Sequence, residues 1–129
     1  MHTAPYFAAL GLLTIVHALR VILLRRKHKV GIGNGGVPEL ERMIRVFGNH
    51  AEFVPIGLIL LIALEFVQAP VWYCHAVGLT LLLGRVLHAM GLSRTAGASA
   101  GRAGGTLLTL VSLLLSSVGI IIFSLLVRP

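Results

Sequence analysis

The stretch RMIRVFGNHAEFVP, residues 42–55, places charged side chains at the start of an apolar run. Four of its polar side chains, spaced by three, four and three residues, are Arg42, Arg45, Asn49 and Glu52. At 100° per residue they fall within roughly 80° of one another, so a helix presents them as one stripe. Charged groups in a bilayer segment are costly and usually face a bundle interior or a wet cavity. We therefore expect the stripe to bind a small zwitterionic or anionic molecule.

The alternative is that these side chains only satisfy one another as a structural network inside a bundle. One glutamate cannot neutralise two arginines, however, and Arg85 and Arg102 are expected at a similar depth on other helices. Unpaired guanidinium groups favour carboxylate or phosphate oxygens, which they hold in bidentate fashion. We expect Glu52 to be the anionic partner of Arg85. His88, three residues after Arg85, shares its helix face.

Four apolar runs explain why the 129-residue chain is 57% hydrophobic and only 12% charged. The predicted transmembrane helices cover approximately residues 5–26, 40–67, 71–92 and 104–127. Each is close to the ~20 residues that cross a hydrocarbon core. The predicted fold is therefore a single all-α membrane domain, residues 1–129, built as an integral membrane four-helix bundle.

The formal charge of +7 is concentrated in two connections, residues 25–29 and 94–102, whereas the connection beginning at Gln68 is uncharged. Positive-inside bias predicts that loops one and three are cytoplasmic and that both termini are periplasmic. Arg128 opposes this orientation, but it is one residue against a cluster. The basic residues thus indicate membrane topology, and we expect no nucleic-acid partner.

Several common sites are missing from the sequence. The six histidines never form a close pair with carboxylate or thiolate support, so we expect no metal. The glycine-rich loop one lacks the phosphate-loop pattern, and no Ser-His-Asp signature is present.

Some polar residues lie outside the stripe. His17 and Arg20 share a face of the first helix, where Arg20 is expected to extend to the cytoplasmic headgroups. His50 lies on the opposite side of the second helix from the stripe. The third helix carries three roughly heptad-spaced glycines that allow close helix packing and favour assembly of subunits; they are Gly78, Gly84 and Gly91.

The run from Glu39 to Pro55 has the pattern R-xx-R-xxx-N-xx-E-xx-P and resembles the second helix of the MAPEG family, the membrane-associated proteins of eicosanoid and glutathione metabolism. The segment Gly84-Arg85-Val-Leu-His88-Ala-Met-Gly-Leu is similar to the third helix of that family. Length, number of spans and inferred topology agree over essentially the whole chain. The small bacterial members are the most similar.

This resemblance implies a homotrimer in the bacterial inner membrane, with glutathione as co-substrate between neighbouring subunits at the cytoplasmic side. Membrane lipids and further copies of the chain are the implied partners. By motif, Arg42 supports the charged end of glutathione and Glu52 accepts from its ammonium group. By its place after the first span, Arg25 also approaches a glutathione carboxylate. The implied glutathione-binding residues are Arg25, Arg42, Arg45, Asn49, Glu52, Arg85 and His88.

Family enzymes place an arginine at the start of the fourth helix against the thiol, where a cation favours the thiolate. Arg102 stands at about that place and is the implied catalytic residue. The chain departs from the family pattern twice. Phe53 and Leu92 stand where some members have a tyrosine, so two hydroxyl groups are absent.

The leading interpretation is a glutathione-dependent transferase or peroxidase that acts on hydrophobic electrophiles or lipid hydroperoxides arriving from the bilayer. One alternative is a non-catalytic protein of the same fold that binds a lipid or a thiol. Another is a small multidrug exporter, which needs a membrane carboxylate free of neighbouring cations. Glu52 lies among arginines instead.

Overall fold

The computed structural model describes residues 1–126, and these form four α-helices. The helices are α1 (Ala4–His28), α2 (Pro38–Phe66), α3 (Val71–Arg94) and α4 (Ala100–Leu126). Compared with the predicted boundaries, α2 begins two residues earlier and α4 four residues earlier. Val127 and Arg128, which the sequence analysis used for the last span and for topology, lie outside the described residues.

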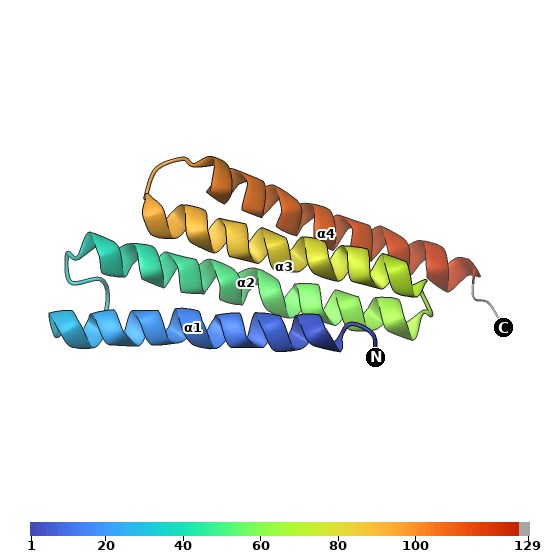
Figure 1. Ribbon diagram of the computed structural model, residues 1–129, viewed down its shortest axis with the longest axis horizontal. Helices are drawn as coiled ribbons and strands as arrows, with labels where there is room; N and C mark the ends of the chain where they lie inside the picture. The colour runs from blue at the N-terminus through green and yellow to red at the C-terminus, as the bar shows by residue number, and fades with distance from the viewer. Residues whose placement is uncertain (127–129) are drawn as a thin grey trace.

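The helices lie side by side in chain order, each antiparallel to the next (Figure 1). Loops one and three are at one end of the bundle, and loop two is at the other end together with the N-terminus (Figure 1). All four helices are long and apolar enough to cross a membrane. The protein is therefore an all-α, four-helix membrane protein, as the sequence predicted.

Helix α2 begins early because its first turn is well suited to a helix start. Pro38 stands at the first helical position, where its missing N–H is not needed, and Glu39 and Glu41 lie at the positive end of the helix dipole. Before it, loop one turns through Gly33, Gly35 and Gly36, all at positive φ. The helix remains continuous through Pro55. The polar stripe is thus held on one uninterrupted helix.

Small residues bring α3 and α4 into close contact. A Cβ on Gly84 would lie 2.9 Å from the backbone nitrogen of Thr109, and one on Gly105 would lie 2.7 Å from the carbonyl oxygen of Gly84. A Cβ on Gly91 would likewise meet the α4 backbone, and one on Gly78 would meet the ring of Tyr6. These glycines therefore serve packing within one subunit. The expectation that they favour subunit assembly is not supported, because their free faces are already occupied.

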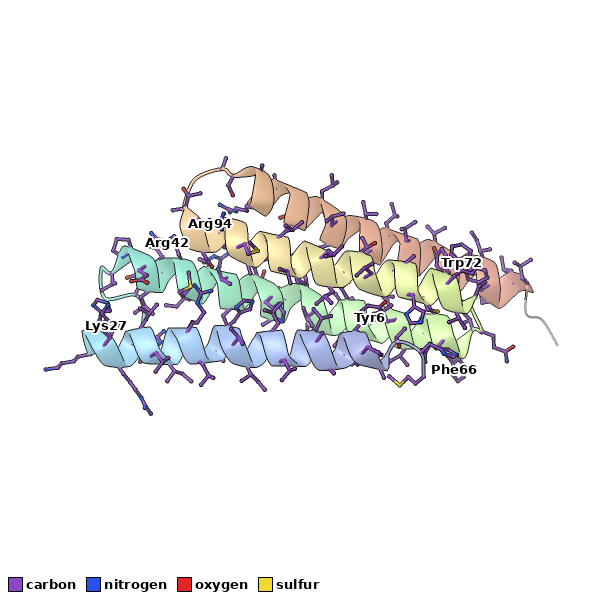
Figure 2. All side chains as sticks on the ribbon, viewed as in Figure 1. Tyr6, Lys27, Arg42, Phe66, Trp72 and Arg94 are labelled. Carbon is purple, nitrogen blue, oxygen red and sulfur yellow. The ribbon has the colours of Figure 1, made fainter. Side chains whose placement is uncertain are left out.

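The apolar core lies in the half of the bundle nearest loop two. Its buried residues are Leu10, Val54, Leu61, Leu64, Ala69, Cys74, Val77 and Leu81. At this end Tyr73 donates its hydroxyl to the carbonyl of Leu115 at 2.7 Å, which joins α3 to α4. Phe66 and Trp72 are exposed there, whereas Lys27, Arg42 and Arg94 mark the opposite end (Figure 2). These two exposed aromatic residues and these three basic residues thus lie at opposite ends of the bundle.

Candidate functional site

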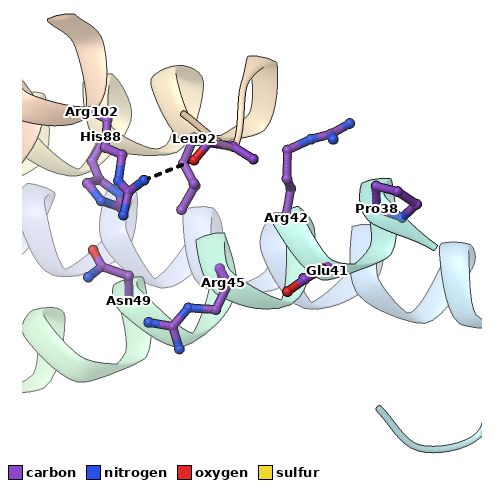
Figure 3. A pocket seen from close by; sticks show the side chains of 9 residues that line it. Pro38, Glu41, Arg42, Arg45, Asn49, His88, Leu92 and Arg102 are labelled. Carbon is purple, nitrogen blue, oxygen red and sulfur yellow. Dashed lines mark hydrogen bonds between the residues drawn. The ribbon is translucent and has the colours of Figure 1, made fainter. Parts of the chain in front are cut away.

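A pocket of about 270 Å³ opens near loops one and three, between α2, α3 and the start of α4. It is lined by Pro38, Glu41, Arg42, Arg45, Asn49, His88, Leu92, Ala96 and Arg102. Arg45 and Asn49 lie on the α2 wall, and Arg102 lies beside His88 on the opposite wall (Figure 3). The structure thus brings together five of the predicted site residues.

The α2 wall carries more positive charge than its one carboxylate neutralises. Arg42 and Arg45 line the pocket together with Glu41, one residue before Arg42. The Nε atom of Arg42 is buried and has no hydrogen-bond partner among residues 1–126. A buried donor without an acceptor costs about 1–3 kcal/mol. The wall is therefore suited to a ligand that supplies anionic oxygens.

Arg85 lies behind the pocket and fixes the side chain of Asn49. It is only 2% exposed, and its Nη1 donates to Asn49 Oδ1 at 2.8 Å and to the Asn49 carbonyl at 3.2 Å. Its Nε donates to Thr109 Oγ1 at 3.1 Å. Arginine has no acceptor, so the bond fixes which amide atom of Asn49 faces Arg85. The two N–H donors of Asn49 are thereby left for an acceptor in the pocket.

The prediction that Glu52 forms an ion pair with Arg85 is wrong. Within residues 1–126, the hydrogen-bond partners of Arg85 are neutral groups on Asn49 and Thr109. The Arg85 guanidinium also lies 5.4 Å from the ring centre of Phe53. Glu52 is exposed instead. On a helix it is rotated by roughly 60° from Asn49, which suffices to turn it away from α3.

Arg102 lies in the first turn of α4, which explains its place in the pocket. Its backbone N–H donates to Ser99 Oγ at 3.2 Å, so Ser99 caps the helix. Its guanidinium donates to the carbonyl of Ala96 at 3.3 Å, the bond drawn in Figure 3. This contact folds loop three against the pocket. The prediction that this helix begins at residue 104 missed the Ser99 cap, which is visible in the sequence.

The other predicted residues lie elsewhere. Arg25 donates to the carbonyl of Gly31 in loop one at 3.1 Å and does not line the pocket.

Two residues at the site were not predicted from the sequence. They are Glu41, which lines the pocket, and Thr109, which accepts a hydrogen bond from Arg85. Thr109 belongs to a buried row of small residues at helical spacing, Gly105, Thr109, Ser112, Ser116 and Gly119, and this row was the available signal. No metal-binding group of three side chains occurs within residues 1–126.

The part of the chain that forms the bundle and the pocket is similar to known proteins. A model of the MAPEG family matches residues 3–122. The chain belongs to the MAPEG family. This match includes α1, α2, α3, most of α4 and the residues that line the pocket.

Two similar proteins carry the same name. The inner membrane protein YecN of Escherichia coli strain K12 is 36% identical over 91 residues, which cover 70% of each chain. The protein of that name from Escherichia coli O6:H1 matches with the same identity and coverage. Together with the four apolar helices, this similarity supports a multi-pass protein of the inner membrane.

Proposed function

We propose that this MAPEG protein is a glutathione-dependent transferase or peroxidase of the inner membrane, acting on hydrophobic electrophiles or lipid hydroperoxides. The observation that carries the proposal is the pocket, which is lined by three arginines and a single carboxylate. Glutathione has two carboxylates and one ammonium group. Two guanidinium groups match the carboxylates, and the N–H donors of Asn49 match a peptide carbonyl.

We further propose that the site is completed by a neighbouring subunit in a homotrimer. The volume of about 270 Å³ is just below the roughly 300–1,000 Å³ of typical ligand pockets. Glu52 is an exposed carboxylate on a membrane helix, and Arg25 is only half-buried. An exposed charge at that depth requires a partner. An assembly that turns Glu52 toward the glutathione of the next subunit supplies one.

The proposed chemistry depends on forming the glutathione thiolate. A free thiol has a pKa of about 8.5, so little thiolate exists at neutral pH. The Arg102 guanidinium beside the sulfur would lower that pKa and hold the anion. The thiolate then attacks the electrophilic carbon, and the displaced electron pair leaves with the leaving group. The protein mainly positions the nucleophile and excludes competing water.

Calorimetric titration of the purified protein with glutathione in mild detergent tests the proposal. We expect one site per subunit, and Arg45→Ala should weaken binding roughly ten- to hundredfold because a charge-assisted contact is lost. Arg26→Ala is the matched control, since Arg26 is an exposed arginine of α1 that does not line the pocket. Equal affinity in the wild type and both variants would refute the site.

A non-catalytic, thiol-binding role is the second candidate, and Leu92 is the observation that favours it. Leu92 lines the pocket and offers no hydroxyl to a bound thiol, and Phe53 offers none beside Arg85. Glutathione binding without consumption of a test electrophile such as a chlorinated nitrobenzene would favour this role. Turnover that depends on Arg102 would favour the enzyme.

We also propose that loops one and three are cytoplasmic and both termini periplasmic. Arg25, Arg26 and Arg94 lie at one end of the bundle, and the opposite end has no basic cluster in loop two. Single cysteines placed in loop two should react with an impermeant maleimide in intact spheroplasts. Cysteines in loop one should react only after lysis, and the opposite pattern would reverse the orientation.

A further inference from the structure

A second cavity lies on the other side of α3, between α1 and α3. It has a volume of about 430 Å³ and shares no lining residue with the glutathione pocket. Its lining residues are Leu13, Val16, His17, Arg20, Val86, Ala89, Met90, Ser93 and Arg94. We call it the α1–α3 groove. None of its nine lining residues is acidic.

The mouth of the α1–α3 groove is polar and positively charged. Arg20 donates from NH1 to Ser93 Oγ at 3.3 Å, so α1 and the end of α3 meet at this level. Arg94 is the last residue of α3, and both arginines are exposed. Loop three begins directly after Arg94, which places the mouth at the depth of the lipid headgroups. Two guanidinium groups and a hydroxyl there are suited to a phosphate diester.

The polarity of the groove falls with depth along α1. At 1.5 Å per residue, His17 lies roughly 4–5 Å deeper than Arg20, and Leu13 lies roughly 10 Å deeper. His17 is 3% exposed, and neither of its ring nitrogens has a partner among residues 1–126. Its ring packs edge-on against His50, which bonds Thr14 at 2.9 Å. Beyond His17 the walls are apolar side chains of α1 and α3.

We propose that the α1–α3 groove binds one anionic phospholipid from the leaflet on the side of loops one and three. The phosphate lies between Arg20 and Arg94, and the glycerol esters lie at the level of His17. One acyl chain then follows the apolar wall formed by Val16, Val86 and Met90. This order of phosphate, ester and chain matches the order of polarity along the groove.

The charge of the groove selects the lipid class. A basic residue near an anionic membrane surface contributes about 1 kcal/mol, which corresponds to roughly fivefold in affinity. With two arginines and no carboxylate in the lining, the groove favours a net-negative headgroup over a zwitterionic one. The glutathione pocket opens on the opposite side of α3, so lipid binding does not depend on the proposed enzymatic activity.

Fluorescence quenching by brominated lipids tests the site. Trp72 is the only tryptophan and lies at the loop-two end, so it is first changed to phenylalanine. Met90→Trp then places a reporter at an exposed position in the groove wall. In bilayers, brominated phosphatidylglycerol should quench this reporter at roughly twentyfold lower mole fraction than brominated phosphatidylcholine, because the two arginines contribute about fivefold each. Arg20→Gln and Arg94→Gln should each reduce that preference roughly fivefold.

Two controls separate the groove from the general lipid annulus. Arg26→Gln removes the same charge from an exposed position outside the groove and should leave the preference unchanged. A reporter at Leu114, an exposed position of α4, should show no headgroup preference.

Three results would overturn the proposal. One is equal quenching by both lipids at Met90→Trp. Another is no quenching by either lipid, which would mean that a second subunit covers the groove. The third is loss of the preference on addition of inorganic phosphate, which would mean that a free anion occupies the mouth.

Discussion

The two ends of the bundle satisfy their polar groups in different ways. At the loop-two end, the hydroxyl of Tyr73 reaches a carbonyl of α4, and the hydroxyl of Tyr6 reaches the carbonyl of His75 at 3.2 Å. At the end of loops one and three, Arg42 keeps a buried Nε without a partner among residues 1–126, and Arg85 is held only by neutral groups. The loop-two end leaves only a neutral hydroxyl, that of Thr3, without a partner among residues 1–126, whereas the other end has positive charge left over.

This difference indicates where function is located in a small membrane protein. An uncompensated buried cation is unfavourable, so it persists only where something else supplies the anion. The apolar core holds the four helices in register, and that register aligns Arg42, Arg45 and Asn49 with Arg102. The loop-two end thus provides stability, and we propose that the opposite end binds the ligand.

The largest expected effect comes from breaking the close packing of α4 against α3. Gly105→Ala places a Cβ against the backbone of His88 and Gly84, neither of which can move aside. We expect it to lower the free energy of unfolding by about 3 kcal/mol, the upper part of the range for overpacking. Gly104→Ala is the control, because a Cβ there meets nothing within 4 Å. Thermal unfolding in detergent measures both, and similar midpoints would contradict the packing argument.

The next effect concerns Glu52, which does not line the pocket of its own subunit. Glu52→Gln should weaken glutathione binding by about 1.5–3 kcal/mol, roughly ten- to hundredfold, because the ligand ammonium loses its carboxylate. Native mass spectrometry should show the proposed trimer for both the wild type and this variant. A correctly assembled variant with wild-type affinity would show that Glu52 does not reach a neighbouring site.

A smaller effect should follow from changing the donors of Asn49 without removing its acceptor. Asn49→Asp keeps an oxygen for Arg85 but loses both N–H groups that remain for the ligand. We expect the protein to remain folded and glutathione affinity to fall by about 1.5 kcal/mol or more, since the new carboxylate also repels an anionic ligand. Calorimetry measures this loss, and unchanged affinity would mean that Asn49 only anchors Arg85.

The smallest effect is expected at the loop-two end. Tyr73→Phe removes the hydroxyl that bonds the Leu115 carbonyl and should cost about 1 kcal/mol of stability. Trp72→Phe alters a neighbouring ring that is 70% exposed and should cost less. Neither substitution should change glutathione affinity. A loss of binding in Tyr73→Phe would show that the two ends are coupled more closely than we propose.

The fold and the family could be predicted from sequence, because hydropathy depends only on composition along the chain and the R-xx-R-xxx-N-xx-E motif is contiguous. The stripe predicted that Arg42, Arg45 and Asn49 share a face, and all three line the pocket. Contacts between helices were harder to predict. The partner of Arg85 depended on how far α3 is rotated and on Thr109 of α4, and neither can be read from spacing within one helix.

The helix ends show a similar limit. The start of α4 depends on the Ser99 cap within a run of small residues, where hydropathy has little contrast. The glycines of α3 indicated close packing, but only the structure identified α4 and the ring of Tyr6 as the surfaces they meet.

The most direct test of the proposed chemistry is the ultraviolet absorbance of the thiolate when glutathione is added to the protein at pH 7. Free glutathione forms little thiolate at that pH, so the absorbance should rise in proportion to occupied sites. Arg102→Ala should remove most of the rise while binding weakens only modestly, since Arg45 and Asn49 still hold the tripeptide. Tight binding with no thiolate, and no consumption of an electrophile, would contradict the enzymatic function and leave a thiol-binding membrane protein.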